Sequence, residues 1–184
     1  MKKDLGAKNF YYPTLTVIVG ANVDGKPNYI TIAWGGIMGM DTLYIGMNKS
    51  HYTNKGIIEN KSFSVNIPSV NLVKETDYCG LYSGKNTDKA SLFNTFYGKL
   101  GNVPMIEECA ANMECELIEK IDSRNHDIFI GKIVATYCDE QYMTDGKADL
   151  KKLQPVLFSF HDSTYWSIGD CIAKAWSVGK ELKK

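Results

Sequence analysis

The chain has 184 residues, of which 44% are hydrophobic and 23% charged, with 21 Lys+Arg balanced by 21 Asp+Glu. This length and composition predict one domain that buries roughly 70% of its unfolded surface. A formal net charge of zero argues against binding to nucleic acid and against a polybasic membrane patch. The first eight residues have no apolar signal core, and no apolar run approaches the roughly 18 residues of a membrane span. We therefore expect a cytoplasmic protein.

The cysteines and histidines show no metal-ligand spacing. The five cysteines are odd in number and include no CxxC pair, which indicates reduced thiols rather than a disulfide framework. The three histidines, His51, His126 and His161, lie far apart in the sequence. We expect no metal site.

Three predicted strands occupy the first quarter of the chain. Residues 14–20 (TLTVIVG), 28–34 (NYITIAW) and 42–47 (TLYIGM) are rich in β-branched and apolar side chains. Asp24-Gly25 is a typical hairpin turn between the first two. The short connections predict an antiparallel meander.

The second of these strands ends at a tryptophan whose ring could be exposed. Alternation directs Ile30 and Ile32 into a core, while Thr31 and Ala33 lie on the opposite surface. Trp34 ends the strand, and three glycines follow within five residues. A planar ligand can lie against such a ring beside bare backbone. Alternatively, Trp34 is a core tryptophan followed by a flexible turn.

A short helix over residues 53–59 follows the third strand. Ser50 and Thr53 are both good N-cap residues. Hydroxyls and unpaired N–H groups at a helix start form a seat for an anion, to which Lys49 and Lys55 add positive charge. Capping alone explains the two hydroxyl residues equally well.

The remaining elements predict a β-barrel with helical decoration, in a single domain over residues 1–184. We expect six or seven strands and three short helices. In chain order the elements are a strand at 63–68, a helix from Ser69 to Cys79 ended by Gly80, a short helix capped by Thr87 and running through Phe93, a loop at 102–108, a hairpin of strands 113–121 and 126–137, a polar connector at 139–153 and a last strand at 155–160. The tail from about residue 161 carries aromatic side chains, which predicts docking on the body or on a second subunit.

Two further residues have both a functional and a structural interpretation. Lys89 falls in the first turn of the helix after Thr87, where the helix dipole disfavours a cation unless an anion binds there. Otherwise it is a solvated surface lysine. His126, at the mouth of the hairpin, either contacts a ligand or is an exposed turn histidine.

Five motifs occur in a fixed order: GKPNYITIAW, NKSHYT, FSVNIP, YCGLYSGKNTDK and NHDIFIGKI. In this order they resemble the flavin reductase-like, FMN-binding split-barrel family, and are especially similar to its flavoredoxin branch. The match runs over about residues 13–166. Each motif alone is weakly specific, whereas five in the family order are strongly specific. None is the dinucleotide fingerprint GxGxxG, and the strand pattern is not βαβ, which excludes a Rossmann fold.

The resemblance implies a mainly β, antiparallel, Greek-key-like split barrel that forms a homodimer and binds FMN at or near the subunit interface. Carried over position by position, it implies these FMN contacts: Asn28, Thr31, Ala33 and Trp34 on the opening strand, Asn48, Ser50 and Thr53 on the phosphate side, Ser83 and Lys89 in the SG…DK element, His126 in the hairpin and Phe160 on the late strand. Many relatives have an arginine where this chain has Lys49-Ser50-His51-Tyr52-Thr53, so the number of charged contacts to the phosphate is left open.

The chemistry of FMN agrees with these residue types. A dianionic phosphate suits the Ser50 and Thr53 helix start, and the rings suit Trp34 and its glycines. Lys89 at the pyrimidine edge would favour reduced flavin and raise its potential. No protein acid, base or nucleophile is expected to be essential.

The sequence thus predicts an FMN-dependent oxidoreductase of the flavin reductase or flavoredoxin type. It would pass electrons from NAD(P)H or a redox protein through FMN to a small acceptor, a flavin or a protein. The alternative is a flavin-binding or electron-carrier protein without its own NAD(P)H turnover. A purely structural barrel would take up no FMN.

Overall fold

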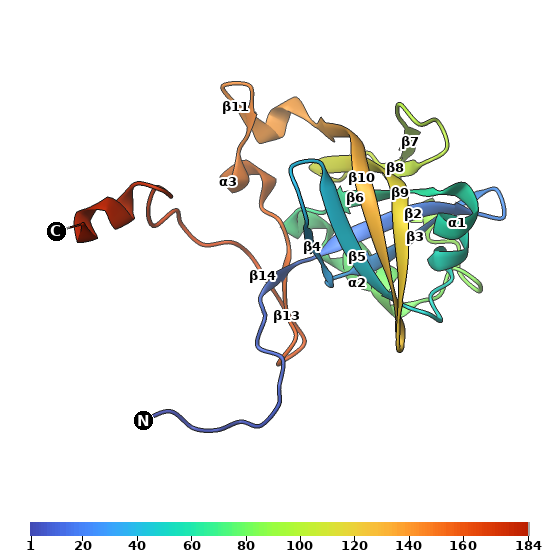
Figure 1. Cartoon of the computed structure of the whole chain (residues 1–184). Helices are drawn as coiled ribbons and strands as arrows, with labels where there is room; N and C mark the ends of the chain where they lie inside the picture. Colours follow the sequence, from blue (N-terminus) through green and yellow to red (C-terminus); the bar gives the residue numbers. More distant parts are fainter. Residues whose placement is uncertain (184) are drawn as a thin grey trace.

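The structure is a computed structural model that describes residues 1–183, and it is mainly β (Figure 1). The strands are β1 (Thr14–Leu15), β2 (Val17–Val23), β3 (Lys26–Ile32), β4 (Gly35–Ile37), β5 (Thr42–Asn48), β6 (Ser62–Ile67), β7 (Thr95–Tyr97), β8 (Pro104–Ile106), β9 (Ala111–Ser123), β10 (His126–Cys138), β11 (Met143–Thr144), β12 (Lys147–Ala148), β13 (Leu157–Ser159) and β14 (Thr164–Trp166). The helices are α1 (Thr53–Asn60), α2 (Val73–Leu81) and α3 (Leu150–Leu153), with 3₁₀ turns η1 (Val70–Leu72), η2 (Ala90–Leu92), η3 (Glu140–Tyr142) and η4 (Val178–Leu182).

One seven-stranded antiparallel sheet forms the body, in the order β3-β2-β6-β9-β10-β5-β4. Its two edge strands, β3 and β4, are separated in sequence by only Ala33 and Trp34. The sheet must therefore curl until its edges meet, which closes it into a barrel and leaves no long open edge. At the seam the Gly46 amide donates a 2.6 Å hydrogen bond to the Trp34 carbonyl oxygen. The antiparallel split barrel expected from the sequence is confirmed.

The predicted three-stranded meander is wrong in its third strand. β2 and β3 do pair as a hairpin, through a turn in which Asp24 and Gly25 both adopt positive φ. β5, however, pairs with β4 and β10 and not with β3. The reason is that the chain crosses the seam at Trp34 and forms the edge strand β4 before it turns back, so β5 pairs with β4 on the other side of the sheet.

Two apolar clusters lie on the two faces of β2 and β3. Ile30 and Ile32 belong to the cluster inside the barrel, as predicted, together with Phe63 and Phe129. The opposite face is covered rather than open, since the completely buried Tyr29 packs in a second cluster. That second cluster comprises Ile18, Tyr29, Cys79, Phe93, Ile106 and Cys109. The second cluster fixes α2 and η2 against the outside of β3.

Helix α1 packs closely on the barrel. Ile57 is completely buried in the barrel core, and the Cβ that any other residue would carry at Gly56 would collide with the Asn22 carbonyl oxygen. Asn60 Nδ2 also donates to this oxygen at 2.7 Å. Glycine at position 56 thus lets α1 approach β2, and this contact sets the position of Thr53 at the start of the helix.

The predicted caps of α1 are wrong. The residue before the helix is Tyr52, whose side chain makes no capping hydrogen bond, and Thr53 is already the first helical residue. Ser50 Oγ donates instead to Asn48 Oδ1 at 2.8 Å, within the turn that follows β5. The two hydroxyl residues are consequently free of a capping role.

Other local predictions also differ from the structure. The predicted loop at 102–108 contains β8, which pairs with β7, and β14 follows the predicted last strand. α2 continues through Gly80 to Leu81, because Gly80 does not adopt the positive φ of a glycine that ends a helix. Thr87 does not cap η2; the Asp88 carboxylate accepts hydrogen bonds from the Ala90 and Ser91 amides.

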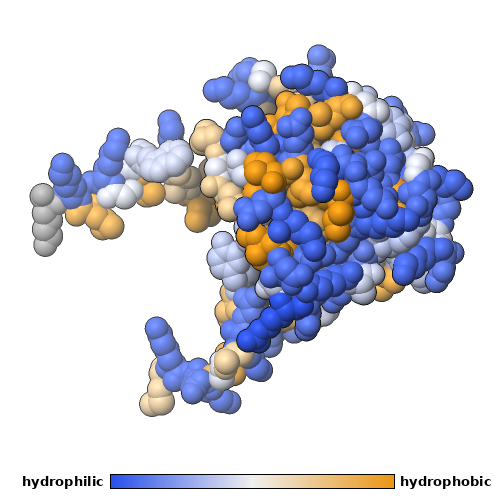
Figure 2. Space-filling view, turned by 45° about the vertical axis from the view of Figure 1, so that its right-hand side comes forward, coloured by the Kyte–Doolittle hydropathy of each residue, from blue (hydrophilic) through white to orange (hydrophobic). Residues whose placement is uncertain are grey.

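Beyond β14 the chain runs away from the barrel (Figure 1). Ile172 and Trp176 are 98% and 96% exposed, and Lys151 Nζ forms a 2.9 Å ion pair with Asp170. Figure 2 shows both ends of the chain projecting from the body, with hydrophobic residues gathered on the visible face of the body. Docking of the tail on a second subunit stays a prediction.

Candidate functional site

A polar cavity of about 200 Å³ lies where the start of α1 faces the end of α2. Four predicted site residues line it: Ser50, Thr53, Ser83 and Lys89. They come from three separate parts of the chain, which the packing of α1 and α2 on the barrel brings together. The cavity therefore combines hydroxyl groups with one cation.

Lys89 is a buried cation, with 2% of its surface exposed. Its Nζ donates to the carbonyl oxygens of Cys79 at 3.0 Å and Tyr82 at 2.9 Å, at the C-terminal end of α2. This is the end of a helix dipole that favours positive charge. Burial lowers the pKa of the Lys89 ammonium, and none of the ion pairs within residues 1–183 includes it. The solvated-surface interpretation is thus wrong, and an anion in the cavity would stabilise the charge.

The side chain of Thr53 is held in place by Asn28, which does not itself line the polar cavity. Asn28 Nδ2 donates a 2.7 Å hydrogen bond to Thr53 Oγ1, and both residues are buried. A Cβ at Gly84 would collide with Asn28 Oδ1, so this close approach requires glycine. Asn28 lines a neighbouring cavity of about 550 Å³ instead, and acts on the polar cavity through Thr53.

A second cavity, of about 340 Å³, opens at the end of β3. Six predicted site residues line it: Thr31, Ala33, Trp34, Asn48, His126 and Phe160. The Trp34 ring centroid lies 4.9 Å from that of His126 and 5.9 Å from that of Phe160. Trp34 is 44% exposed, so it is not a core tryptophan. His126 packs on this ring and is half-buried, so it is not simply an exposed turn histidine.

The hydroxyl of Thr31 is partly engaged by the neighbouring helix. Thr31 lines the second cavity, and its Oγ1 donates to the Thr76 carbonyl oxygen of α2, so this hydroxyl can act toward a ligand only as an acceptor. Asn48 pairs with His126 across β5 and β10, which explains why these two residues meet at one cavity.

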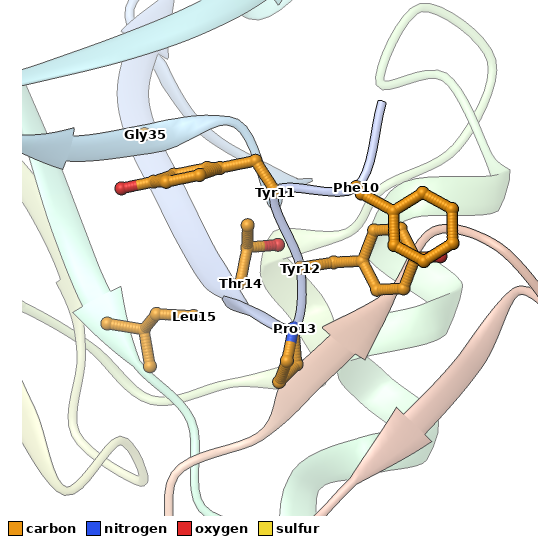
Figure 3. Close-up of a pocket in the computed structure, with 7 residues that line it drawn as sticks. All are labelled: Phe10, Tyr11, Tyr12, Pro13, Thr14, Leu15 and Gly35. Atoms are coloured by element: carbon orange, nitrogen blue, oxygen red, sulfur yellow. The ribbon is translucent and has the colours of Figure 1, made fainter. Parts of the chain in front are cut away.

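The N-terminal segment forms a further wall beside Trp34 that the sequence analysis did not identify. Tyr11 and Tyr12 line a cavity of about 250 Å³ together with Trp34 and Phe160. In the adjoining cavity of about 330 Å³, Tyr11 extends along β4 beside Gly35, whereas the Phe10 and Tyr12 rings lie together on the other side of the chain (Figure 3). The run FYYP at residues 10–13 is the signal from which this wall could have been found.

His51 is a second residue that sequence reasoning missed. It lines both the polar and the aromatic cavity. Burial, the Lys89 charge and His126 together lower the pKa of its imidazole. Its Nδ1 is buried without a hydrogen-bond partner among the described residues. Its place between Ser50 and Tyr52 in NKSHYT was the available signal.

The family model "Flavin reductase like domain" matches residues 9–165. The chain belongs to this family. A flavoredoxin structure from Methanosarcina acetivorans is 44% identical with a TM-score of 0.95, and 99% of each chain is covered. A flavoredoxin from Desulfovibrio vulgaris (Miyazaki F) is 37% identical with a TM-score of 0.91, covering 97% of this chain and 100% of that one. A protein of Archaeoglobus fulgidus is 29% identical over 145 residues, which are 77% of this chain and 81% of that protein.

Family membership makes this a flavin-binding redox protein, and the donor set of the two cavities fits a flavin. Hydroxyls and an ammonium without an ionic partner suit a phosphate, and exposed aromatic rings suit the isoalloxazine. His51 lines both cavities. Across residues 1–183, no helix is long and apolar enough to cross a membrane, and no group of three or more His, Cys, Asp or Glu could hold a metal ion.

Proposed function

We propose that the chain binds FMN and passes electrons from NAD(P)H or a redox protein to a small acceptor, a flavin or another protein. The observation that carries this proposal is that a hydroxyl-lined cavity containing buried Lys89 and an aromatic cavity containing exposed Trp34 share the lining residue His51. A flavin mononucleotide has the same two ends, a charged phosphate and an apolar ring system.

Each cavity contributes a different part of FMN binding. The Thr53 and Ser83 hydroxyls would donate to the phosphate, and Lys89 would neutralise part of its charge. The Ser50 hydroxyl, which donates to Asn48 Oδ1, would join them only by turning away from Asn48. Lys89 shares its cavity with Ser50 and Thr53 and not with Trp34, which favours a phosphate contact over the pyrimidine edge. When bound, the flavin supplies the redox chemistry.

The aromatic cavity would orient the ring system. Trp34, His126 and Phe160 form its aromatic wall, with Ala33 and Asn48 beside them. The Thr31 side chain can accept a hydrogen bond from a ring N–H. These residues bind the rings and exclude water, so we assign none of them a role as acid, base or nucleophile.

The second candidate is an electron carrier that retains FMN and does not oxidise NAD(P)H itself. The similarity to two flavoredoxins favours it. The carrier would exchange electrons only with other redox proteins. We also propose that the chain forms a homodimer, supported by the exposed apolar tail, and that it is cytoplasmic, supported by its five free cysteines.

A flavin titration followed by anaerobic reduction tests the proposal. We expect FMN to bind with quenched fluorescence, and rapid loss of its visible absorbance with NADH or NADPH if the chain is an oxidoreductase. Absorbance lost only with dithionite or a reduced redox protein would support the carrier. A protein that takes up no FMN at micromolar concentration would contradict the proposed function. Trp34→Ala should weaken binding, whereas the exposed Trp166→Ala serves as the matched control.

A further inference from the structure

His51 is the residue shared by the polar and the aromatic cavity, and no other lining residue is common to both. Its backbone is fixed in the turn between β5 and α1, since its amide donates to Asn48 O at 3.0 Å and its carbonyl accepts from the Asn54 amide at 3.2 Å. The imidazole is therefore held on the boundary that the polar and the aromatic cavity share.

The surroundings of the ring determine its chemistry. The lowered pKa favours the neutral imidazole, and the neighbouring Lys89 charge disfavours a second cation. Nδ1 is inaccessible and has no acceptor to which it could donate within residues 1–183, so the proton belongs on Nε2. Because the ring lines both cavities, Nε2 is the nitrogen that a ligand can reach.

We propose that His51 binds the polyhydroxyl chain that joins the phosphate of the ligand to its rings, with Nε2–H donating to a chain hydroxyl. This inference rests on the proposed function, because that function puts the phosphate in one cavity and the rings in the other. A hydroxyl accepts from Nε2–H and retains its own proton for a water or a carbonyl oxygen, so it is a suitable partner for a neutral imidazole.

Three flavins that differ in one group each test this assignment. Lumiflavin has the rings alone, riboflavin adds the polyhydroxyl chain and FMN adds the phosphate. We expect His51→Ala to weaken the binding of riboflavin and of FMN by a similar factor, on the order of tenfold for one hydrogen bond. The affinity for lumiflavin should be unchanged. His51→Gln, which retains a donor, should recover part of the loss. Lys132→Ala, at an exposed residue outside both cavities, is the control.

The other outcomes overturn the assignment. An equal loss for all three flavins would show that His51 acts on the rings or on the fold, and a loss for FMN alone would place it at the phosphate. Unchanged affinities would exclude any contact. If the unmodified chain binds none of the three flavins, the proposed function fails as well. Urea unfolding of each variant separates a folding defect from a binding defect. If His51→Ala does not fold, the same comparison of the three flavins is made with His51→Gln.

Discussion

Lys89 combines a positive charge with nearly complete burial. Its ammonium has two carbonyl partners, which leaves one of its three N–H donors for a ligand. An anion in the polar cavity would raise the lowered pKa of Lys89 again, so binding of phosphate and protonation of Lys89 should reinforce each other.

We predict that Lys89→Met weakens the binding of FMN more than the binding of riboflavin, because only FMN carries the phosphate. One charge-assisted hydrogen bond corresponds to roughly ten- to hundredfold in affinity. Fluorescence titration with both flavins measures the ratio, and Lys85→Met, an exposed lysine of the same loop, is the control. An unchanged ratio with a lowered midpoint potential would place Lys89 at the pyrimidine edge instead.

Gly84 permits the contact that positions Thr53. In Gly84→Ala the new Cβ would displace the Asn28 amide from Thr53, and we expect a destabilisation of about 1–3 kcal/mol together with weaker FMN binding. Urea unfolding and FMN titration measure the two effects. Gly169→Ala adds a Cβ that meets no atom within 4 Å and should be neutral. A neutral Gly84→Ala would show that the Asn28 amide is not needed for the site.

The His51 imidazole should make stability depend on pH. Its folded-state pKa is lowered, whereas the unfolded chain protonates near the ordinary value of about 6.5. The unfolded state therefore binds more protons as the pH falls through this value, and the contribution of His51 to stability is lost on acidification down to its folded pKa. Lys89 and His126 face the ring and disfavour its charged form.

Urea unfolding at pH 7.5 and pH 5.5 checks this sign. We expect the unmodified chain without flavin to lose more stability on acidification than His51→Gln does, since carboxylates titrate alike in both. An equal loss in the two proteins would exclude a contribution from His51.

Individual site residues could be predicted from the sequence where a side chain occupied a position that its chemistry does not favour. Trp34 at a strand end and Lys89 at an unfavourable helix position are two such cases, and the structure brings both to cavities. The motif NKSHYT was a signal for His51, but the unpartnered state of its Nδ1 depends on packing between segments far apart in sequence and could not be predicted. The contact of Gly84 with Asn28 is likewise a tertiary contact that no local pattern encodes.

At the scale of elements, the loop that carries Lys89 depends on Asp88. Its carboxylate accepts from the amides of Ala90 at 3.1 Å and Ser91 at 3.3 Å, which ends the loop and begins η2. A side-chain acceptor at this position stabilises the first turn by about 1 kcal/mol. The position of Lys89 therefore depends on a neighbour that does not line the polar cavity itself.

We predict that Asp88→Ala lowers the melting temperature by about 2–4 °C, since roughly 1 kcal/mol is lost in a chain of this size. FMN affinity should fall as well, because the loop no longer fixes Lys89. Differential scanning calorimetry and FMN titration measure the two quantities. Asp88→Asn retains the acceptor and should stay close to the unmodified chain; a loss as large as that of alanine would instead implicate the charge.

Strands and helices were predictable where alternation or composition is local. The hairpin of β9 and β10 and the strand β6 follow from such patterns. The partner of β5 was not predictable, because pairing is set by the closure of the whole sheet at Trp34. The caps of α1 were mispredicted because Ser50 and Thr53 find partners in Asn48 and Asn28 instead.

At the scale of the whole molecule, the exposed tail and the apolar surface of the body are the features that support the proposed dimer. Ile172, Trp176 and Leu182 are exposed on the tail, and Ile37 and Met40 are exposed on the body. Burying large apolar side chains stabilises an association by about 1.5–3 kcal/mol each before the entropy of association is subtracted.

We predict that the full chain is a dimer and that Trp176→Ser weakens the dimer about tenfold or more, since roughly 1.4 kcal/mol corresponds to a factor of ten. Sedimentation velocity over a range of concentrations measures the dissociation constant. Lys174→Ser, an exposed charged residue of the same segment, is the matched control. A monomeric full chain, or equal dissociation constants for the two variants, would contradict this role of the tail.

The seam at Trp34 links the architecture of the barrel to its ligand. The backbone of Trp34 closes the sheet through Gly46, while its ring forms a wall of the aromatic cavity. Any residue at position 34 keeps this carbonyl oxygen, so a substitution there changes the aromatic wall and leaves the closure of the sheet intact. Related proteins that evolve toward other flavins or other electron partners should therefore be able to exchange the ring at this position without losing the barrel.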